Sequence, residues 1–202
     1  MCIRDSPVAV RVVTAVQPRT DLRVAIELDG NPWLVLDALV ATELGIFLDA
    51  VLSASTKRTA EQRVREARAL DRGAAMVGRR SHARGELEQR IAKREGADAA
   101  RQAADRLEAI GAIDDTRHAS DVATLRLTTG WGPARIAHDL EVAGVAPAEI
   151  QDCLAHLDDA AIDQAAQIAI GARTGAEAWQ RLASRGFDES VAERLVGQPF
   201  DD

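Results

Sequence analysis

Arginines concentrate in one quarter of this 202-residue chain, and they are the side chains best suited to bind a charged partner. Residues 57–106 carry 14 basic and 8 acidic side chains, for a net charge of +6. Residues 1–56 have a net charge of −3 and residues 107–202 a net charge of −10. Because a planar guanidinium binds phosphates and carboxylates through paired N–H groups, the basic segment suits an anionic partner. A solvated helix surface is the competing interpretation.

The candidate binding residues are arginines in and after the basic segment. They are Arg79, Arg80, Arg84, Arg90 and Arg94, with Arg126 and Arg135 further along the chain. If they bind DNA phosphates, affinity should fall steeply with salt, because each phosphate contact releases counterions. If they bind an acidic protein surface, salt should also weaken binding, but the protein partner would be required.

Motifs for catalysis, cofactors and metals are missing from the sequence. Gly130-x-Gly132 lacks the third glycine of a nucleotide-binding loop and follows a predicted helix, so we interpret these glycines as a break between two helices. Cys153-x-x-His156 has half the spacing of a zinc site, but no second pair accompanies it. The sequence therefore predicts a protein that is not an enzyme, with no cofactor and no bound metal.

Composition is typical of a folded helical protein. Apolar residues make up 47% of the chain, charged residues 28% and aromatic residues 3%, which favours helices packed through small aliphatic side chains. Two cysteines are too few for a disulfide framework, so a reducing cytoplasm is the expected location. No apolar run approaches the ~20 residues of a membrane span. Residues 1–6 are too short and polar for a signal peptide, and we assign them no role.

Residues 7–56 predict a small β-rich module. Three segments are rich in β-branched residues or alternate with period two. The expected strands are 8–13, 23–28 and 33–36. Three strands form a hairpin-based sheet that needs a partner surface to be stable.

Turn and cap signals separate the elements of this module. Asp29–Pro32 predicts a turn between the second and third strands, in which Gly30 and Asn31 can take positive φ. Asp37 predicts the N-cap of a short helix over residues 38–44.

From about residue 57 the sequence predicts helices in a pattern that occurs three times. Each copy has an apolar pair spaced four residues apart, then a glycine, then a second such pair. The pairs are Leu87/Ile91 with Ala103/Leu107, Ile136/Leu140 with Ile150/Leu154, and Ala178/Leu182 with Val191/Leu195. This spacing marks the buried face of a helix, and Gly96, Gly144 and Gly186 fall where the chain must turn.

A further helix is expected before the first pair of each copy, so that each unit contains three helices. These helices are 58–79, 115–129 and 159–172. Aspartates suited to helix starts are Asp98, Asp114 and Asp188. One unit of ~40 residues cannot bury its apolar face alone, so neighbouring units should stack. The prediction is a mainly α fold of three tandem three-helix repeats, 57–111, 112–157 and 158–202, that form an elongated curved solenoid.

Motifs along these units resemble the RecX family. Ile110–Ala119 is similar to the RecX junction between the first and second repeats, and Gly130–Ile136 to the start of the second repeat's middle helix. Arg79–Leu87 and Arg185–Asp188 resemble the matching segments of the first and third repeats. The resemblance covers about residues 12–197, including a β extension, although His118 stands where the family usually has an aromatic residue.

The resemblance implies a regulator of the RecA recombinase. Such a protein binds the RecA filament and the single-stranded DNA within it, limits filament growth, and damps recombination and coprotease activity. It implies no membrane partner, and we expect a monomer that binds duplex DNA weakly. Capping of filament ends and binding along the filament groove are both compatible with the sequence.

Two other classes of function remain open. One is a stand-alone helical DNA-binding module, because three-helix units resemble helix-turn-helix folds. It would bind duplex DNA tightly without RecA, and the overall net charge of −7 argues against it. The other is a protein scaffold whose binding ignores DNA.

Overall fold

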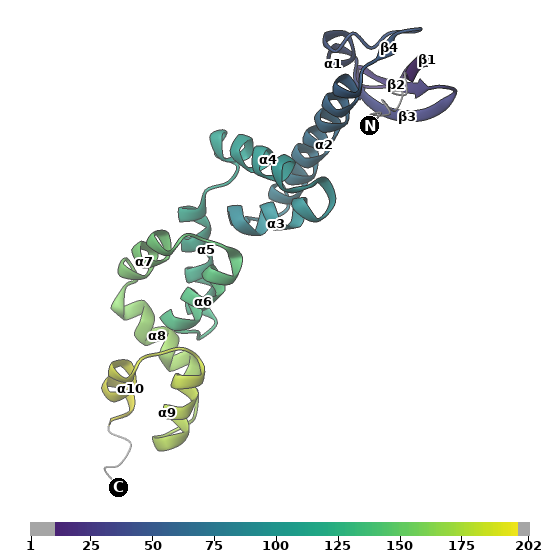
Figure 1. Cartoon of the computed structure of the whole chain (residues 1–202). Helices are drawn as coiled ribbons and strands as arrows, with labels where there is room; N and C mark the ends of the chain where they lie inside the picture. Colours follow the sequence, from purple (N-terminus) through teal and green to yellow (C-terminus); the bar gives the residue numbers. More distant parts are fainter. Residues whose placement is uncertain (1–10, 198–202) are drawn as a thin grey trace, which may run out of the picture. The chain divides into compact units, whose positions relative to one another are not determined.

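The computed structural model describes residues 11–197, which form a small N-terminal sheet followed by helices (Figure 1). The strands are β1 (Arg11–Pro18), β2 (Arg23–Leu28), β3 (Asn31–Asp37) and β4 (Val51–Leu52). The helices are α1 (Ala38–Glu43), α2 (Ala54–Val77), α3 (Arg84–Glu95), α4 (Ala97–Ala109), α5 (Asp115–Thr128), α6 (Pro133–Ala143), α7 (Pro147–Ala155), α8 (Asp159–Ile170), α9 (Gly175–Ser184) and α10 (Glu189–Val196). The predicted mainly α fold with a small strand module is confirmed. Among the described helices, none has the length and apolar character needed to cross a membrane.

Antiparallel pairing arranges the strands in the order β3-β2-β1-β4. Strand β2 has the predicted limits, and β3 is longer than expected at both ends. The predicted first strand began at Val8, and residues 8–10 lie outside the described residues, as do residues 1–6. The expectation of three strands was wrong, because Val51 and Leu52 add a fourth strand alongside β1. Two residues are too few to produce an alternating pattern that a sequence could show.

The turn between β2 and β3 places its left-handed residues one position earlier than expected. They are Asp29, with φ of 50°, and Gly30, with φ of 77°. Two successive positive φ values are typical of the hairpin turns that match strand twist. The Asp29 carboxylate accepts hydrogen bonds from the Val12 backbone N–H (2.9 Å) and from Arg11 Nη1 (2.7 Å), which stabilises the left-handed conformation.

The described residues divide into two compact units, of which the first comprises residues 11–72 and 91–103. Its core lies where the sheet, α1 and α2 meet (Figure 1). The buried residues there are Val13, Ile26, Leu28, Leu36, Ala41, Ile46, Ala50, Leu52, Ala60 and Val64. Helix α2 therefore supplies the partner surface that a small sheet requires. The predicted cap of α1 is confirmed, because the Asp37 carboxylate accepts a hydrogen bond from the Leu39 N–H.

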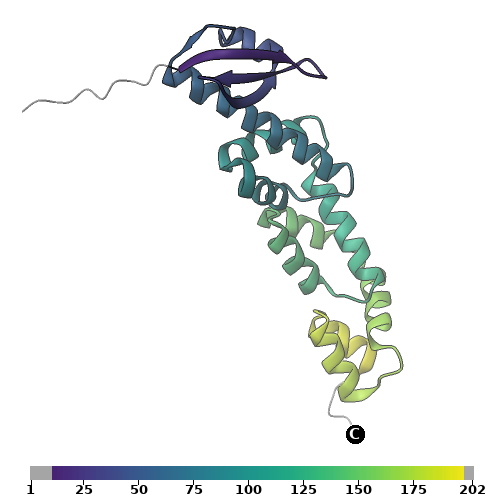
Figure 2. The same cartoon turned by 90° about the vertical axis from the view of Figure 1, so that its right-hand side faces the viewer.

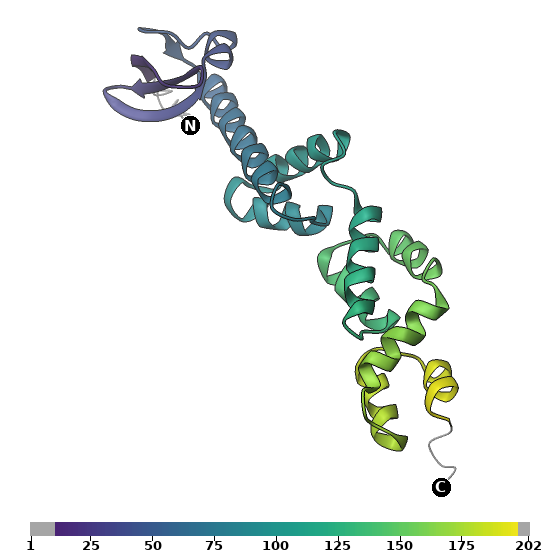
Figure 3. The same ribbon diagram turned by 180° about the vertical axis from the view of Figure 1, so that it is seen from behind.

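The second unit comprises residues 73–90 and 104–197, and its helices group in threes. Helix α5 contacts α6, α7 and α8, while α8 in turn contacts α9 and α10 (Figures 2 and 3). The predicted caps Asp114 and Asp188 accept hydrogen bonds from backbone N–H groups at the starts of α5 and α10.

The apolar pairs that predicted the helices are on buried faces. Leu87, Ile91, Ile136, Leu140 and Leu182 are 0% exposed. The other members of the pairs are also buried, except for Leu154 and Leu195, which are partly buried. The assignment of buried helix faces from i, i+4 spacing is therefore confirmed.

Two close backbone approaches join neighbouring groups of helices in the second unit. A Cβ atom on Gly132, at the N-cap of α6, would overlap the carbonyl oxygen of Gly186, in the turn between α9 and α10. A Cβ atom on Gly85, near the start of α3, would lie 2.8 Å from the carbonyl oxygen of Gly144, in the turn between α6 and α7. Glycine is required at these positions because neighbouring backbone occupies the space of a side chain. Gly132 therefore does more than mark the start of α6, because it also allows this close backbone contact.

These two joints connect equivalent segments. In each, the start of one middle helix meets the turn that follows the next middle helix. This recurrence supports the tandem-repeat interpretation, while the predicted unit limits at residues 57, 112 and 158 stay a prediction.

Candidate basic interface

The predicted arginines occur around α3 and around the connection between α5 and α6. The first group is Arg79 and Arg80 before α3, Arg84 at its first position, and Arg90 and Arg94 one turn apart within it. The second group is Arg126 near the end of α5 and Arg135 in the first turn of α6. The ion pairs of each arginine decide how much of its charge is available to a partner.

Arg84 is committed to three carboxylates of its own chain. Its Nε lies 3.0 Å from Glu88 Oε1 and its Nη2 lies 2.5 Å from Asp105 Oδ1, while its Nη1 pairs with Glu108. The hydrogen bond to Asp105 is the main reason that the pKa of Arg84 is raised. Asp105 and Glu108 belong to α4, so the Arg84 guanidinium ties α3 to α4. Among the predicted residues, Arg84 has the least capacity left for an external ligand.

Glu86 attracts three basic side chains at the start of α3. Its Oε1 is 2.8 Å from both Arg80 Nη2 and Arg90 Nη2, and its Oε2 is 2.8 Å from His82 Nδ1. Burial raises the pKa of Glu86, but hydrogen bonds from His82 and Arg80 outweigh it, so the pKa is below its usual value. Arg80 and Arg90 are 53% and 54% exposed and share one carboxylate. Together they keep one uncompensated positive charge and free N–H donors.

Arg79 and Arg94 make no ion pair or side-chain hydrogen bond with any residue between 11 and 197. Both are exposed. Their charges are the most available of the first group, which makes them the strongest candidates for contact with an anionic partner.

The second group shares a carboxylate and lies beside an aromatic ring. Asp139 Oδ2 is 2.6 Å from Arg126 Nε, and Asp139 Oδ1 is 3.0 Å from Arg135 Nε. The guanidinium of Arg135 lies 5.1 Å from the centre of the Trp131 ring, and that of Arg185 lies 4.0 Å from it. Arg185 was not among the predicted residues, although the turn glycine that follows it was recognised.

Known proteins resemble this chain in sequence over most of its length. It is 31% identical over 139 residues to "Regulatory protein RecX" of Pseudomonas fluorescens strain SBW25, a match that covers 63% of this chain and 89% of that protein. It is 30% identical over 152 residues to the protein of the same name from Stenotrophomonas maltophilia strain K279a, covering 70% of this chain and 93% of that protein. The chain belongs to the RecX family.

The fold of this RecX-family protein agrees with solved structures of the family. A crystal structure of regulatory protein RecX superimposes with a TM-score of 0.67 and 17% identity, covering 92% of this chain and 98% of that one. RecX from Lactobacillus salivarius gives a TM-score of 0.56 at 17% identity, covering 64% of this chain and 93% of that one. No family model matches the chain. The protein is a regulator of the RecX type, consistent with the lack of catalytic motifs in its sequence.

His118, the departure from the RecX pattern noted in the sequence, is buried close to α3. It is 6% exposed, and its Nδ1 lies 2.7 Å from Ser81 Oγ. Burial lowers the pKa of His118 from its usual 6.5, against the opposing effect of the Asp115 and Glu86 carboxylates. The nearby basic groups His82 and Arg80 lower it further. His118 is therefore neutral in the folded RecX chain at neutral pH.

We expect this RecX-family protein to lose stability as the pH falls below 6.5, in part through His118. Because the folded-state pKa is the lower one, the unfolded chain takes up the proton first. The contribution of His118 to the free energy of unfolding is fully present above its unfolded-state pKa and declines as the pH falls towards its folded-state pKa. Urea midpoints at pH 7.5 and pH 5.5 measure this decline. It should be smaller in His118→Phe, whereas His138→Phe, at an exposed position, should behave as wild type. Equal declines in wild type and His118→Phe would contradict the assignment.

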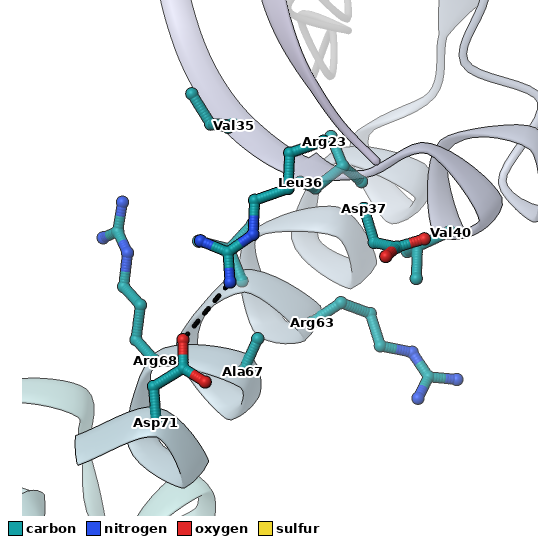
Figure 4. A pocket seen from close by; sticks show the side chains of 10 residues that line it. Arg23, Val35, Leu36, Asp37, Val40, Arg63, Ala67, Arg68 and Asp71 are labelled. Carbon is teal, nitrogen blue, oxygen red and sulfur yellow. Dashed lines mark hydrogen bonds and ion pairs between the residues drawn. The ribbon is translucent and has the colours of Figure 1, made fainter. Parts of the chain in front are cut away.

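A pocket in the first unit offers a different kind of site. It has a volume of about 210 Å³ and lies between β2, β3 and α2 (Figure 4). Arg23, Arg63 and Arg68 line it together with Asp37 and Asp71, and Arg23 Nη2 pairs with Asp71 Oδ2 at 3.3 Å. Because arginines and aspartates face the same space, the pocket selects neither sign of charge, and we assign it no ligand.

Cys153 and His156, which have half the spacing of a zinc site, gain no further metal ligands from the residues that the structure describes. Among residues 11–197, no three His, Cys, Asp or Glu side chains lie close enough to hold a metal ion. Burial raises the pKa of the Cys153 thiol, which disfavours the thiolate that a metal would need.

Proposed function

We propose that this protein binds the RecA–DNA filament and inhibits the recombinase and coprotease activities of RecA. The observation that carries the proposal is family membership, since the chain matches 93% of a curated RecX protein at 30% identity. RecA is the partner that the family resemblance implies. We further propose that the protein acts as a monomer, with the single-stranded DNA of the filament as part of its target and only weak binding to duplex DNA.

The arginines around α3 are the proposed contact surface. Arg79 and Arg94 are exposed without carboxylate partners among residues 11–197, and Arg80 and Arg90 share Glu86. A surface of this kind attracts phosphates and acidic protein surfaces alike. Binding should therefore weaken as salt increases, whichever component of the filament these arginines contact.

RecA activity tests the proposal directly. RecA ATPase on single-stranded DNA and RecA strand exchange should both fall when the protein is added in stoichiometric amounts. Absence of inhibition in both assays would refute it. A pull-down with RecA, with and without single-stranded DNA, separates the alternatives. Capture that needs the assembled filament supports a regulator, whereas tight duplex binding without RecA would favour a stand-alone DNA-binding module.

The double variant Arg79→Ala/Arg80→Ala should weaken filament inhibition by about a hundredfold, because two hydrogen bonds to charged groups are lost and each contributes roughly 1.5 kcal/mol. Its melting temperature should change little, since the one ion pair it removes joins the half-exposed Arg80 to Glu86, which keeps its contacts with His82 and Arg90. A pair of this kind near the surface contributes about 1 kcal/mol or less. The concentration needed for half inhibition of the RecA ATPase measures the effect.

The matched control is Arg101→Ala, which removes one exposed arginine from α4. It should inhibit RecA as well as wild type does. Arg84 is left out of the test because its removal would leave three carboxylates without their cation. Equal inhibition by wild type and the double variant would place the contact surface elsewhere.

A further inference from the structure

Two arginines lie over the Trp131 ring and three more lie beside those two, in the part of the chain that is otherwise the most acidic. Residues 107–202 contain 7 basic and 17 acidic residues, so most of the basic residues of this segment belong to one place. The members of this Trp131 cluster are Arg126, Arg135, Arg173, Arg181 and Arg185. Three of them were not among the candidates that the sequence suggested.

The cluster is assembled by the joint between two groups of helices. The Gly132 N–H donates to the carbonyl oxygen of Arg185 (2.9 Å), which fixes the connection between α5 and α6 against the turn after α9. A Cβ atom on Gly130 would lie 3.1 Å from the backbone nitrogen of Ala169, in the last turn of α8. The glycines on both sides of Trp131 therefore allow close contact with segments that carry the other arginines.

Helix ends hold three of these arginines in place. Arg185 lies over the Trp131 ring, and its Nη1 donates to the carbonyl oxygen of Thr129, the C-cap of α5 (3.4 Å). Arg181 and Arg173 donate to carbonyl oxygens in the last turn of α8, at 3.4 and 3.1 Å. The negative end of a helix dipole favours cations there. Each of these bonds uses one N–H, and a guanidinium has five, so most donors stay available.

The positive charge of the cluster is poorly compensated. Arg126 and Arg135 share the single carboxylate of Asp139. The other three arginines form no ion pair with any residue between 11 and 197. Five cations therefore face one paired anion.

The same lack of compensation is seen at Arg185. Burial lowers the pKa of Arg185, and the positive charges of Arg181 and Arg173 lower it further, with no carboxylate acting against them. Glu177 is one helical turn from Arg181 but makes no ion pair within the described residues. Arginines that repel one another gain most from an anionic ligand that bridges them.

We propose that the Trp131 cluster is a binding site for the phosphate backbone of nucleic acid. Successive phosphates offer several equivalent acceptors to several fixed guanidinium groups. Because guanidinium groups already cover Trp131, its ring holds the arginines in position and does not stack on bases, so binding is independent of sequence. The proposal rests on the proposed function only because DNA is there part of the target. Binding of nucleic acid to the Trp131 cluster can be measured without RecA.

The double variant Arg181→Gln/Arg185→Gln tests this site. Fluorescence anisotropy of the full chain with a labelled oligo-dT should show about a hundredfold weaker binding than wild type, since two charged contacts are lost and each contributes about tenfold. The slope of log affinity against log salt should become shallower by about 1.4, at roughly 0.7 per phosphate contact on single strands. Arg173→Gln, at an exposed position, should show a smaller loss in the same direction without risk to the fold.

Arg117→Gln is the matched control. Arg117 also lies in the acidic segment and donates one N–H to a backbone carbonyl, that of Gly111 (3.4 Å), but it is about 18 Å along α5 from Thr129. It should bind oligo-dT as wild type does. A duplex of equal length shows whether single or double strands are preferred, and poly-glutamate serves as competitor.

Three results would overturn the proposal: no DNA binding by wild type, equal binding by the double variant, or competition by poly-glutamate as strong as that by unlabelled DNA. The last would assign the cluster to an acidic protein surface. Loss of DNA binding in the double variant with RecA inhibition intact would support this site while showing that inhibition depends on other residues. Failure of the proposed function is therefore distinguishable from failure of this inference.

Discussion

Replacing Gly132 by alanine is expected to lower the melting temperature of the protein by about 6 to 12 °C. The added Cβ would overlap Gly186 O and lie 2.7 Å from Phe187 N, and both are backbone atoms that cannot rotate away. Gly132 has φ of −89°, which alanine adopts without strain, so the penalty comes from the contact alone. Overpacking typically costs roughly 1–3 kcal/mol, and a clash with fixed backbone lies at the upper end, about 3 kcal/mol. Each kcal/mol lowers the melting temperature by roughly 2–4 °C in a chain of this size.

Gly78→Ala is the control for this substitution. Its Cβ would meet only the Ala74 carbonyl oxygen, at 3.3 Å, and its φ is outside the left-handed region. Differential scanning calorimetry should show little change for Gly78→Ala and a large decrease for Gly132→Ala. Equal melting temperatures would mean that the joint at Gly186 is not formed in solution. Because this joint also positions Arg185, Gly132→Ala should weaken oligo-dT binding as well.

Replacing Leu140 by alanine is expected to reduce the free energy of unfolding by about 2–5 kcal/mol, the usual cost of a cavity in a packed core. Leu140 is 0% exposed and lies on α6, within the core of the second unit. Its neighbour in the chain, Asp139, holds Arg126 and Arg135. The loss should therefore disturb the second group of arginines as well as the core.

Leu125→Ala provides the comparison, because the same side chain is removed from α5 at a position that is 61% exposed. Its effect should stay within about 0.5 kcal/mol. Urea denaturation of both variants measures the difference. If the two substitutions cost the same, the i, i+4 pair Ile136/Leu140 would not mark a buried helix face.

The basic residues separate into two kinds once their partners are known. Arg84 holds α3 against α4 through Asp105 and Glu108, whereas Arg79 has no such partner within the described residues. In the sequence they are equivalent, since both are arginines in the same basic segment. The difference arises from residues that α4 brings near, and helix identity alone does not reveal which carboxylates face which arginine.

Local chemistry determined much of this protein in advance. Apolar pairs four residues apart identified the buried faces of the helices, and Asp114 and Asp188 identified helix starts, because capping and amphipathic spacing act within one or two turns. The alternation of residues 23–28 set the limits of β2 for the same reason. The ordered motifs also pointed to the RecX family, to which the chain belongs.

Only the tertiary structure shows which segments and which charged side chains lie side by side. Strand β4 forms because Val51 and Leu52 pair with the free edge of β1. Two residues are too short a pattern to predict this strand from the sequence. The Trp131 cluster exists because the Arg185 guanidinium reaches the Thr129 carbonyl oxygen, 56 residues away in the chain. Such contacts depend on which backbone segments can approach closely, which Gly132 and Gly186 permit. The spacing of residues along the chain does not predict which backbone segments come close, because that closeness arises from the packing of separate helices.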